Sequence, residues 1–257
     1  MAKAKRKPAA KRKPAAKPKS AKSAAKALHK ERFPNETAAY RKARNDLLKA
    51  EIDLRRQVEA VAAKRRKLPA GGPVPEDYEF EEGAADINDA QTVRKVKLSD
   101  LFKRDASLAV YSYMYGPQMA SPCPMCTSII DALNATAQHA GQRINLVVVA
   151  KSPIQRLRAV ARERGWRNLR LLSSAGNNYN RDYHGEDAEG SQNPALNVFA
   201  KKDGAIRHSW ASELMFAPAD PGQNPRHVDM MWPLWNLFDF TPEGRGKTWF
   251  PKLAYEV

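Results

Sequence analysis

Short apolar runs alternate with amphipathic stretches from about residue 98 to the end of the chain. Ile144–Ala150 is uninterrupted, as expected of a central strand covered on both faces of a sheet. The order of predicted elements, βαβα and then ββα, is that of an α/β protein with a thioredoxin-like fold. Those elements are strand Leu108–Tyr115, helix Thr127–His139, strand Ile144–Ala150, helix Pro153–Arg164, strand Leu169–Ser173, strand Leu196–Ala200, hairpin strand Ala205–Trp210 and helix Pro233–Phe240.

Two further segments precede this core. Residues 28–73 predict one long charged helix over 36–67, followed by a linker, because the helical part is rich in Ala, Lys, Arg and Glu and lacks Gly and Pro. Asn35 is the expected helix cap. We assign residues 74–257 to the thioredoxin-like domain, whose first part carries an acidic patch and short strands.

The basic charge is concentrated at the start of the chain. The net charge is +16, but residues 1–27 hold eleven Lys and Arg and no acidic residue, so 33 basic and 28 acidic residues remain beyond them. Residues 1–27 are also rich in Ala and Pro, which predicts a disordered tail. Such a tail suits non-specific contact with nucleic acid through phosphates, or serves only as a solubilising segment.

Cys123 and Cys126, the only two cysteines, are separated by Pro124 and Met125. The pair lies between a predicted strand and a predicted helix, which is the layout of a thioredoxin-type redox site. A helix N-terminus favours a thiolate and lowers the pKa of its cysteine. Two buried structural thiols, or half of a zinc site, are the alternatives. Zinc needs two further ligands, and the five histidines form no His-x₃₋₅-His pair, so no metal and no cofactor are expected.

Pro194 opens the predicted strand 196–200, where thioredoxin-like chains place a cis proline beside the cysteine pair. We therefore predict a cis Asn193–Pro194 bond and a substrate groove formed by Asn193 and Pro194; an ordinary trans proline is the alternative. The long segment 176–193 precedes it and contains Tyr179 and Tyr183. It is expected either to cover the redox site or to be a solvated loop.

Several motifs carry a resemblance that covers about residues 36–257. They are Tyr115-Gly116-Pro117, the Cys123–Cys126 pair, Val149-Ala150-Lys151-Ser152-Pro153, Gly165-Trp166, Leu172-Ser173-Ser174 and Asp239-Phe240-Thr241-Pro242-Glu243-Gly244-Arg245-Gly246. With these motifs the chain resembles an uncharacterised bacterial thioredoxin-like family of predicted dithiol-disulfide oxidoreductases. The resemblance implies a thioredoxin-like fold and exchange with protein or small-molecule thiols and disulfides.

In the favoured mechanism Cys123 attacks a substrate disulfide and Cys126 resolves the mixed disulfide. The intervening Pro-Met differs from the Gly-Pro of ordinary thioredoxin, and the sequence leaves the direction of electron flow open. Lys151 ends a central strand near the expected site, and we assign it no role in the reaction.

Two other functions are considered. A peroxiredoxin-like peroxide reductase uses Pro-x₃-Thr/Ser-x₂-Cys; Pro117 and Ser121 fit this motif, but Cys123 comes one residue early. A nucleoid-associated protein would use the basic tail, with a redox-inactive or redox-sensing body. Against it, the charge beyond residue 27 is nearly balanced, and Trp210, Trp232, Trp235 and Trp249 are expected to be buried.

The expected location is the cytoplasm. No run of 18 apolar residues predicts a membrane span, and no apolar segment of a signal peptide follows the basic start. A cysteine pair in a reducing compartment is more often catalytic or metal-binding than structural.

Overall fold

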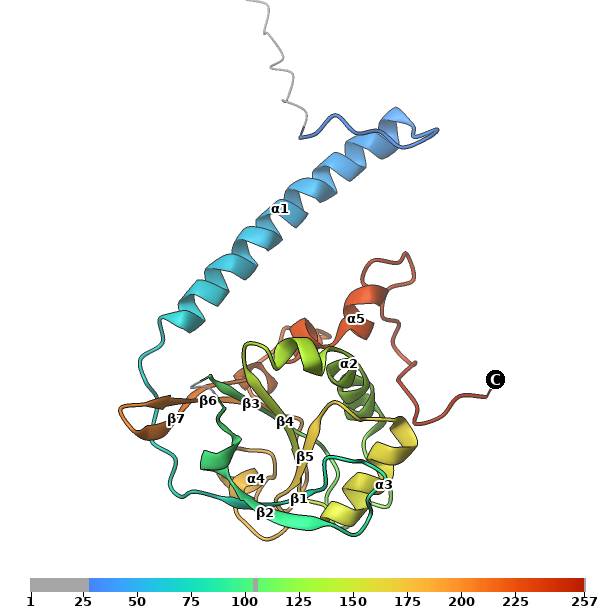
Figure 1. Cartoon of the computed structure of the whole chain (residues 1–257). Coiled ribbons are helices and arrows are strands. Elements are labelled where there is room, and N and C mark those ends of the chain that lie inside the picture. The colour runs from blue at the N-terminus through green and yellow to red at the C-terminus, as the bar shows by residue number, and fades with distance from the viewer. Residues whose placement is uncertain (1–27, 104–105, 257) are drawn as a thin grey trace, which may run out of the picture. The chain divides into compact units, whose positions relative to one another are not determined.

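The computed structural model describes residues 28–103 and 106–256 (Figure 1). The predicted disordered tail, residues 1–27, lies outside the described residues. Contacts divide the chain into two compact units, with the boundary between Ala62 and Ala63.

The predicted long helix is confirmed as α1, Ala38–Arg66. Its cap is Thr37 and not Asn35, because the Thr37 hydroxyl accepts the N–H of Tyr40 at 3.1 Å while Asn35 adopts a left-handed turn conformation with φ 59°. Three basic residues in the last turn suit the negative end of the helix dipole. None of the 29 side chains of α1 is buried, and Leu47 and Leu54 are among its exposed apolar residues.

A seven-stranded sheet of order β2-β1-β5-β4-β3-β6-β7 forms the second unit. Its strands β3, β4 and β5 are parallel, and the other pairings are antiparallel. The strands are β1 (Glu79–Gly83), β2 (Val93–Lys97), β3 (Leu108–Ser112), β4 (Asn145–Ala150), β5 (Arg170–Ser173), β6 (Leu196–Lys202) and β7 (Ala205–Ala211). With the crossover helices this is the predicted thioredoxin-like fold.

The α-helices of this unit are α2 (Pro124–Ala140), α3 (Ile154–Arg164), α4 (Tyr179–Asp182) and α5 (Pro233–Phe238), and the 3₁₀ helices are η1 (Leu98–Leu101), η2 (Glu213–Met215) and η3 (Asp229–Met231). The eight elements expected from residue 108 onward are all present, with ends that differ by a few residues. The two largest differences are in β3, which ends at Ser112 rather than Tyr115, and in α2, which begins at Pro124 rather than Thr127 and so includes Cys126.

Two apolar clusters cover the two faces of the sheet, because side chains alternate along each strand. On one face Tyr111 and Val148 pack with apolar side chains of α2, α3 and α5. On the other face Val110, Val147 and Phe199 pack with aromatic residues from β1 and the 176–193 segment. The colour ramp of Figure 1 shows how these segments, far apart in sequence, meet across the sheet.

The 176–193 segment fills the second of these faces. Tyr179 is fully buried there and stacks edge-on with Phe80 at 5.3 Å, while Tyr183 meets Phe199 at 4.8 Å. Cys126 belongs to the cluster on the opposite face. The expectation that this segment covers the redox site is therefore wrong for its aromatic residues, because burying them in the core outweighs leaving them on a lid.

Residues 71–73, expected to belong to the linker, and Val74, the first residue of the expected domain, pair with the edge strand β7. Gly72 O accepts the N–H of His208 at 3.0 Å, and the N–H of Val74 donates to Ile206 O at 3.0 Å. The backbone approaches so closely that a Cβ on Gly71 would lie 1.9 Å from His208 O. The beginning of the domain thus covers the outer edge of the sheet.

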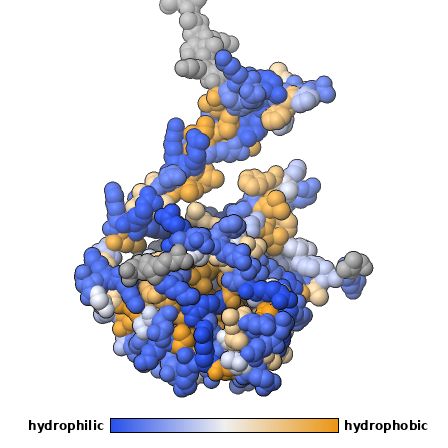
Figure 2. Space-filling view, in the orientation of Figure 1, coloured by the Kyte–Doolittle hydropathy of each residue, from blue (hydrophilic) through white to orange (hydrophobic). Residues whose placement is uncertain are grey.

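The tryptophans differ in burial. Trp232 and Trp235 are buried as expected and Trp210 is half-buried, but Trp249 is 40% exposed, so the expectation is wrong there. Trp249 lies in the C-terminal segment after α5, and its ring meets those of Trp235 and Phe238 edge-on at 6.1 and 5.4 Å. Hydrophilic side chains cover most of this unit on the face shown in Figure 2. Among the described residues, no helix combines the length and apolar character that crossing a bilayer requires.

Candidate redox site

The chain leaves β3 and reverses into α2 at the cysteine pair. The N–H of Cys123 donates to Met114 O at 3.1 Å, which fixes the residue at the end of the loop from β3. Cys123 is the N-cap of α2, and Pro124 occupies the first helical position, where a missing N–H costs nothing. The Cys123 sulfur accepts the N–H of Cys126 at 3.5 Å. Both thiols are therefore in the first turn of a helix that points its positive end at Cys123.

The two thiols are free and have opposite environments. Cys123 is half-buried, and its pKa is lowered to about 6 by hydrogen bonds from the Cys126 thiol and from the N–H groups of Cys126 and Met125, despite a partial loss of solvent. Cys126 is 2% exposed. The neighbouring Cys123 and burial raise the pKa of Cys126 well above its usual value. One sulfur is thus a thiolate near neutral pH, and the other holds its proton.

Two tyrosines, Tyr111 of β3 and Tyr113 of the loop after it, lie near the cysteine pair. The Tyr113 hydroxyl lies 2.7 Å from Thr127 Oγ1, which in turn donates to Cys123 O at 2.9 Å. Tyr111 is fully buried, and its hydroxyl, although short of full hydrogen-bond geometry, lies close enough to Cys126 to lower the pKa of that thiol. Tyr111 therefore partly opposes the effects that keep Cys126 protonated.

Arg156 of α3 fastens the loop that leads to Cys123. Its guanidinium donates to Pro117 O at 3.1 Å and to Met119 O at 2.5 Å. It also stacks over the ring of Tyr115 with 4.6 Å to the centroid. These contacts tie the loop to the core, so that the position of Cys123 does not depend on the helix alone.

The Asn193–Pro194 peptide bond is trans, so the prediction of a cis bond is wrong. The N–H of Ala195 donates to Asn193 O at 3.1 Å, which closes a tight turn around Pro194, and the N–H of Asn193 donates to Gly185 O at 3.0 Å. A three-residue turn of this kind suits the fixed φ of a trans proline. The next residue, Ala195, accepts the N–H of Ser112 at 2.8 Å, so Pro194 lies beside the end of β3.

Met125 lies between the cysteines and is 38% exposed, so an apolar side chain borders the half-buried Cys123.

Lys151, to which the sequence assigned no role, donates to Asn177 O at 2.6 Å and pairs with Glu186 at 3.6 Å. These contacts fasten the 176–193 segment. No cluster of three His, Cys, Asp or Glu arranged to hold a metal occurs within residues 28–103 and 106–256.

Sequence reasoning identified both cysteines but missed Tyr111, Tyr113, Thr127 and Arg156. A partial signal exists for two of them. Tyr111 and Tyr113 alternate along one strand and therefore share a face, and that strand leads into the cysteine loop. No sequence pattern connects Arg156 with the loop 39 residues before it.

Residues 30–255 match the family described as bacterial proteins of unknown function, DUF899. The chain belongs to this family. The match begins after the basic segment 1–27, in agreement with the expectation that this segment lies outside the resemblance. No curated protein matches the chain.

Solved structures with similar folds include several peroxiredoxins. Thioredoxin peroxidase I of Plasmodium yoelii is 20% identical with a TM-score of 0.42, over 65% of this chain and 88% of that one. AhpC of Enterococcus faecalis is 12% identical with a TM-score of 0.43, over 65% and 92%. The reduced 2-Cys peroxiredoxin of Plasmodium vivax is 16% identical with a TM-score of 0.43, over 64% and 93%.

Proposed function

We propose that the protein is a thiol-disulfide oxidoreductase that uses Cys123 and Cys126. The observation that carries the proposal is the division between the two thiols, since the pKa of Cys123 is lowered to about 6 and that of buried Cys126 is raised. A dithiol site needs this division, because the attacking sulfur has to be a thiolate within reach of substrate while the resolving sulfur waits as a thiol.

The exchange proceeds in two displacements. The Cys123 thiolate attacks one sulfur of a substrate disulfide, forms a mixed disulfide and releases the other substrate sulfur as a thiolate, which takes up a proton. The Cys126 thiol then loses its proton and attacks the Cys123 sulfur. This step forms the Cys123–Cys126 disulfide and releases the second substrate thiol. Two electrons pass to the substrate. An external dithiol then supplies two electrons to reduce the Cys123–Cys126 disulfide and is itself oxidised to a disulfide. The reverse sequence oxidises a substrate dithiol.

Protein or small-molecule disulfides are the proposed partners. The exposed Met125 supplies an apolar contact beside Cys123, and Asn193 and Pro194 at the end of β3 remain the proposed substrate-binding residues. With a trans Pro194, such binding would use the half-buried side chains of Asn193 and Pro194, because the backbone N–H and C=O groups of Asn193 and Ala195 are already hydrogen-bonded.

Trapping experiments test the assignment of the two thiols. Cys123→Ser should abolish reduction of a protein disulfide such as that of insulin, because it removes the attacking sulfur. Cys126→Ser should form a stable mixed disulfide with substrate, visible by mass spectrometry, because resolution is lost. The proposal fails if both variants keep equal residual turnover.

Peroxide reduction is the second candidate, favoured by the thiolate character of Cys123. The groups that stabilise this thiolate are a thiol and two backbone N–H groups, and these serve attack on a peroxide as well as on a disulfide. One equivalent of hydrogen peroxide separates the candidates. Rapid formation of a sulfenic acid at Cys123 in the Cys126→Ser variant supports a peroxidase, and slow oxidation supports disulfide exchange.

Contact with nucleic acid through residues 1–27 is proposed as a separate property of the same chain. Its basis is the eleven Lys and Arg without an acidic residue in that segment. A nucleoid-associated protein with a redox-inactive body would keep this property and lack the disulfide exchange described above.

A further inference from the structure

A cavity of about 590 Å³ lies away from the cysteine pair, between β1, β2, Arg158 of α3 and the segment from Trp166 to Leu171 that leads into β5. Its volume is within the range of roughly 300–1,000 Å³ that is common for small-molecule sites. Ile87, Leu169 and Leu171 supply an apolar part of its wall. The cavity is not used by the proposed thiol chemistry.

Basic side chains dominate the wall of this cavity. Two acidic residues, Glu82 and Asp100, face six basic ones: Arg94, Lys95, Lys103, Arg158, Arg167 and Arg170. Lys95 is paired at 2.6 Å with Glu79, which does not line the cavity, so five basic residues remain for the two acidic ones. Asp100 is engaged with its own helix, where it accepts the N–H of Lys97 at 3.1 Å. A concave site lined with one sign of charge attracts counter-ions strongly because its walls exclude solvent.

Arg158 fixes one positive charge at the base of the cavity. The side chain is only 7% exposed, and its guanidinium donates to three backbone carbonyls, those of Ala84 at 2.9 Å, Asp86 at 2.6 Å and Asp89 at 2.9 Å. These neutral acceptors hold the guanidinium in place without cancelling its charge. Gly83 makes room for it, because a Cβ there would lie 2.2 Å from Arg158 Cδ.

Glu82 neutralises only part of the remaining charge. Burial opposes its ionisation, but Arg170 and Arg94 keep its pKa below the usual value. Arg170 donates to Glu82 through Nε at 2.7 Å and Nη2 at 2.9 Å, and Arg94 donates at 2.9 Å. One carboxylate therefore serves two guanidinium groups, and their Nη1 groups take no part in these bonds.

We propose that this cavity binds a small phosphorylated anion. Guanidinium groups in fixed positions recognise phosphate oxygens through paired N–H donors. The excess of basic over acidic groups suits a ligand with several negative charges, such as a diphosphate, and the apolar wall accommodates an organic group attached to it. This inference is independent of the proposed thiol-disulfide exchange.

Calorimetric titration of the full chain with pyrophosphate, AMP and ATP at constant ionic strength tests the proposal. Saturable one-to-one binding of pyrophosphate is expected, and tighter binding of ATP than of pyrophosphate would assign an organic phosphate. Arg167→Gln and Lys103→Gln should each weaken binding about tenfold, the equivalent of one charged hydrogen bond. Both side chains are exposed at the rim, so neither change opens the core.

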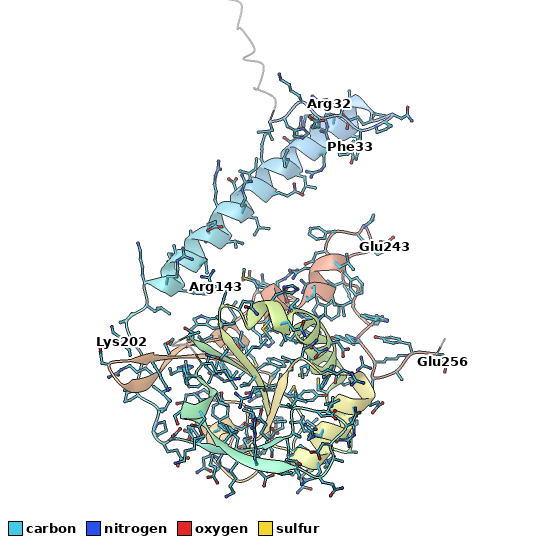
Figure 3. All side chains as sticks on the ribbon, viewed as in Figure 1. Arg32, Phe33, Arg143, Lys202, Glu243 and Glu256 are labelled. Carbon is cyan, nitrogen blue, oxygen red and sulfur yellow. The ribbon has the colours of Figure 1, made fainter. Side chains whose placement is uncertain are left out.

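Arg143→Gln is the matched control, since it removes the same charge from an exposed turn between α2 and β4 outside the cavity (Figure 3). It should leave affinity unchanged, and the basic segment 1–27 is identical in all these chains. The proposal is overturned if no probe gives saturable binding, or if Arg167→Gln and Lys103→Gln bind as tightly as Arg143→Gln. In either case the arginines would serve only to join β1, β2 and β5 through Glu82.

Discussion

Cys123 and Cys126 lie one helical turn apart, yet their surroundings shift the pKa values of the two thiols in opposite directions. Cys123 gains hydrogen bonds from the N-terminal turn of α2, while Cys126 is held in the apolar cluster that includes Tyr111 and Ile129. The same helix start therefore produces a thiolate and a protonated thiol. The largest single influence on each is the other sulfur.

The pH dependence of Cys123 follows from this coupling. In the reduced protein, alkylation of Cys123 by iodoacetamide should rise with pH through about 6 and level off above it, because the thiolate is the reacting form. Cys126→Ala removes the strongest stabilising donor, so the midpoint should move upward, toward the value of about 8.5 of an ordinary thiol. Mass spectrometry of alkylated protein at a series of pH values measures both midpoints. An unchanged midpoint in the variant would contradict the role given to Cys126.

Tyr111 acts on the resolving sulfur. Its hydroxyl lowers the pKa of Cys126, so Tyr111→Phe should raise that pKa further and slow release of substrate from the mixed disulfide. The expected loss is about two- to tenfold in the rate of this step, equivalent to about 0.4–1.4 kcal/mol in its barrier, because the hydroxyl acts on Cys126 without a full hydrogen bond. Stopped-flow measurement should show the slower second step and an unchanged attack by Cys123.

Tyr179→Phe is the control for Tyr111→Phe. Tyr179 is equally buried and its hydroxyl is also unpaired, but it lies on the other face of the sheet. Tyr179→Phe should leave the rates of both the attack by Cys123 and the resolution by Cys126 unchanged. Equal slowing in the two variants would point to a general loosening of the core and not to an effect on Cys126.

At the scale of elements, two adjacent glycines offer a matched comparison. A Cβ at Gly71 would meet the backbone oxygen of His208, whereas a Cβ at Gly72 would meet nothing within 4 Å. Gly71→Ala should therefore lower the free energy of unfolding by about 1–3 kcal/mol through overpacking against β7. Gly72→Ala should be neutral or slightly stabilising, because it restricts the unfolded chain. Urea denaturation of the two variants measures the difference, and equal stability would show that residues 71–74 do not pair with β7.

The elements that could be predicted from sequence are those with strong apolar patterns. The uninterrupted apolar run Ile144–Ala150 predicts a central strand covered on both faces, and Asn145–Ala150 forms β4. The charged strand β2 (Val93–Lys97) was expected only as one of several short strands, because a single residue of it, Val96, is buried. The sequence does not predict the start of α2 at Pro124, because proline disrupts the interior of a helix and is tolerated only in its first turn.

The geometry around the cysteines was less predictable. Cys123 and Cys126 stand out by spacing alone, but Arg156 and Tyr111 contribute through contacts between segments that no local pattern connects. The error at Pro194 has the same origin. A proline before a strand is compatible with either isomer. The trans bond lies in a turn held by hydrogen bonds from the Asn193 N–H to Gly185 O and from the Ala195 N–H to Asn193 O, which only the folded chain provides.

At the scale of the whole molecule, the uneven charge predicts a separable activity. The full chain should bind duplex DNA weakly and without sequence preference. If about six phosphates are neutralised, the logarithm of affinity should fall with the logarithm of salt concentration with a slope of about −5. Fluorescence anisotropy at several salt concentrations measures this slope. A chain lacking residues 1–27 should lose the binding and keep disulfide exchange; a slope near zero, or undiminished binding without the segment, would contradict the assignment.

The pairing of residues 71–74 with β7 also bears on aggregation. An open sheet has two outer strands whose unpaired N–H and C=O groups can recruit another chain. On one side β2 is short and carries exposed Arg94, Lys95 and Lys97, which discourage such recruitment. On the other side, bonds from Gly72 and Val74 occupy backbone groups of β7. Removal of residues 71–74 would uncover this strand, so a shortened chain that begins after residue 74 should self-associate through β7 even with its cysteine pair intact.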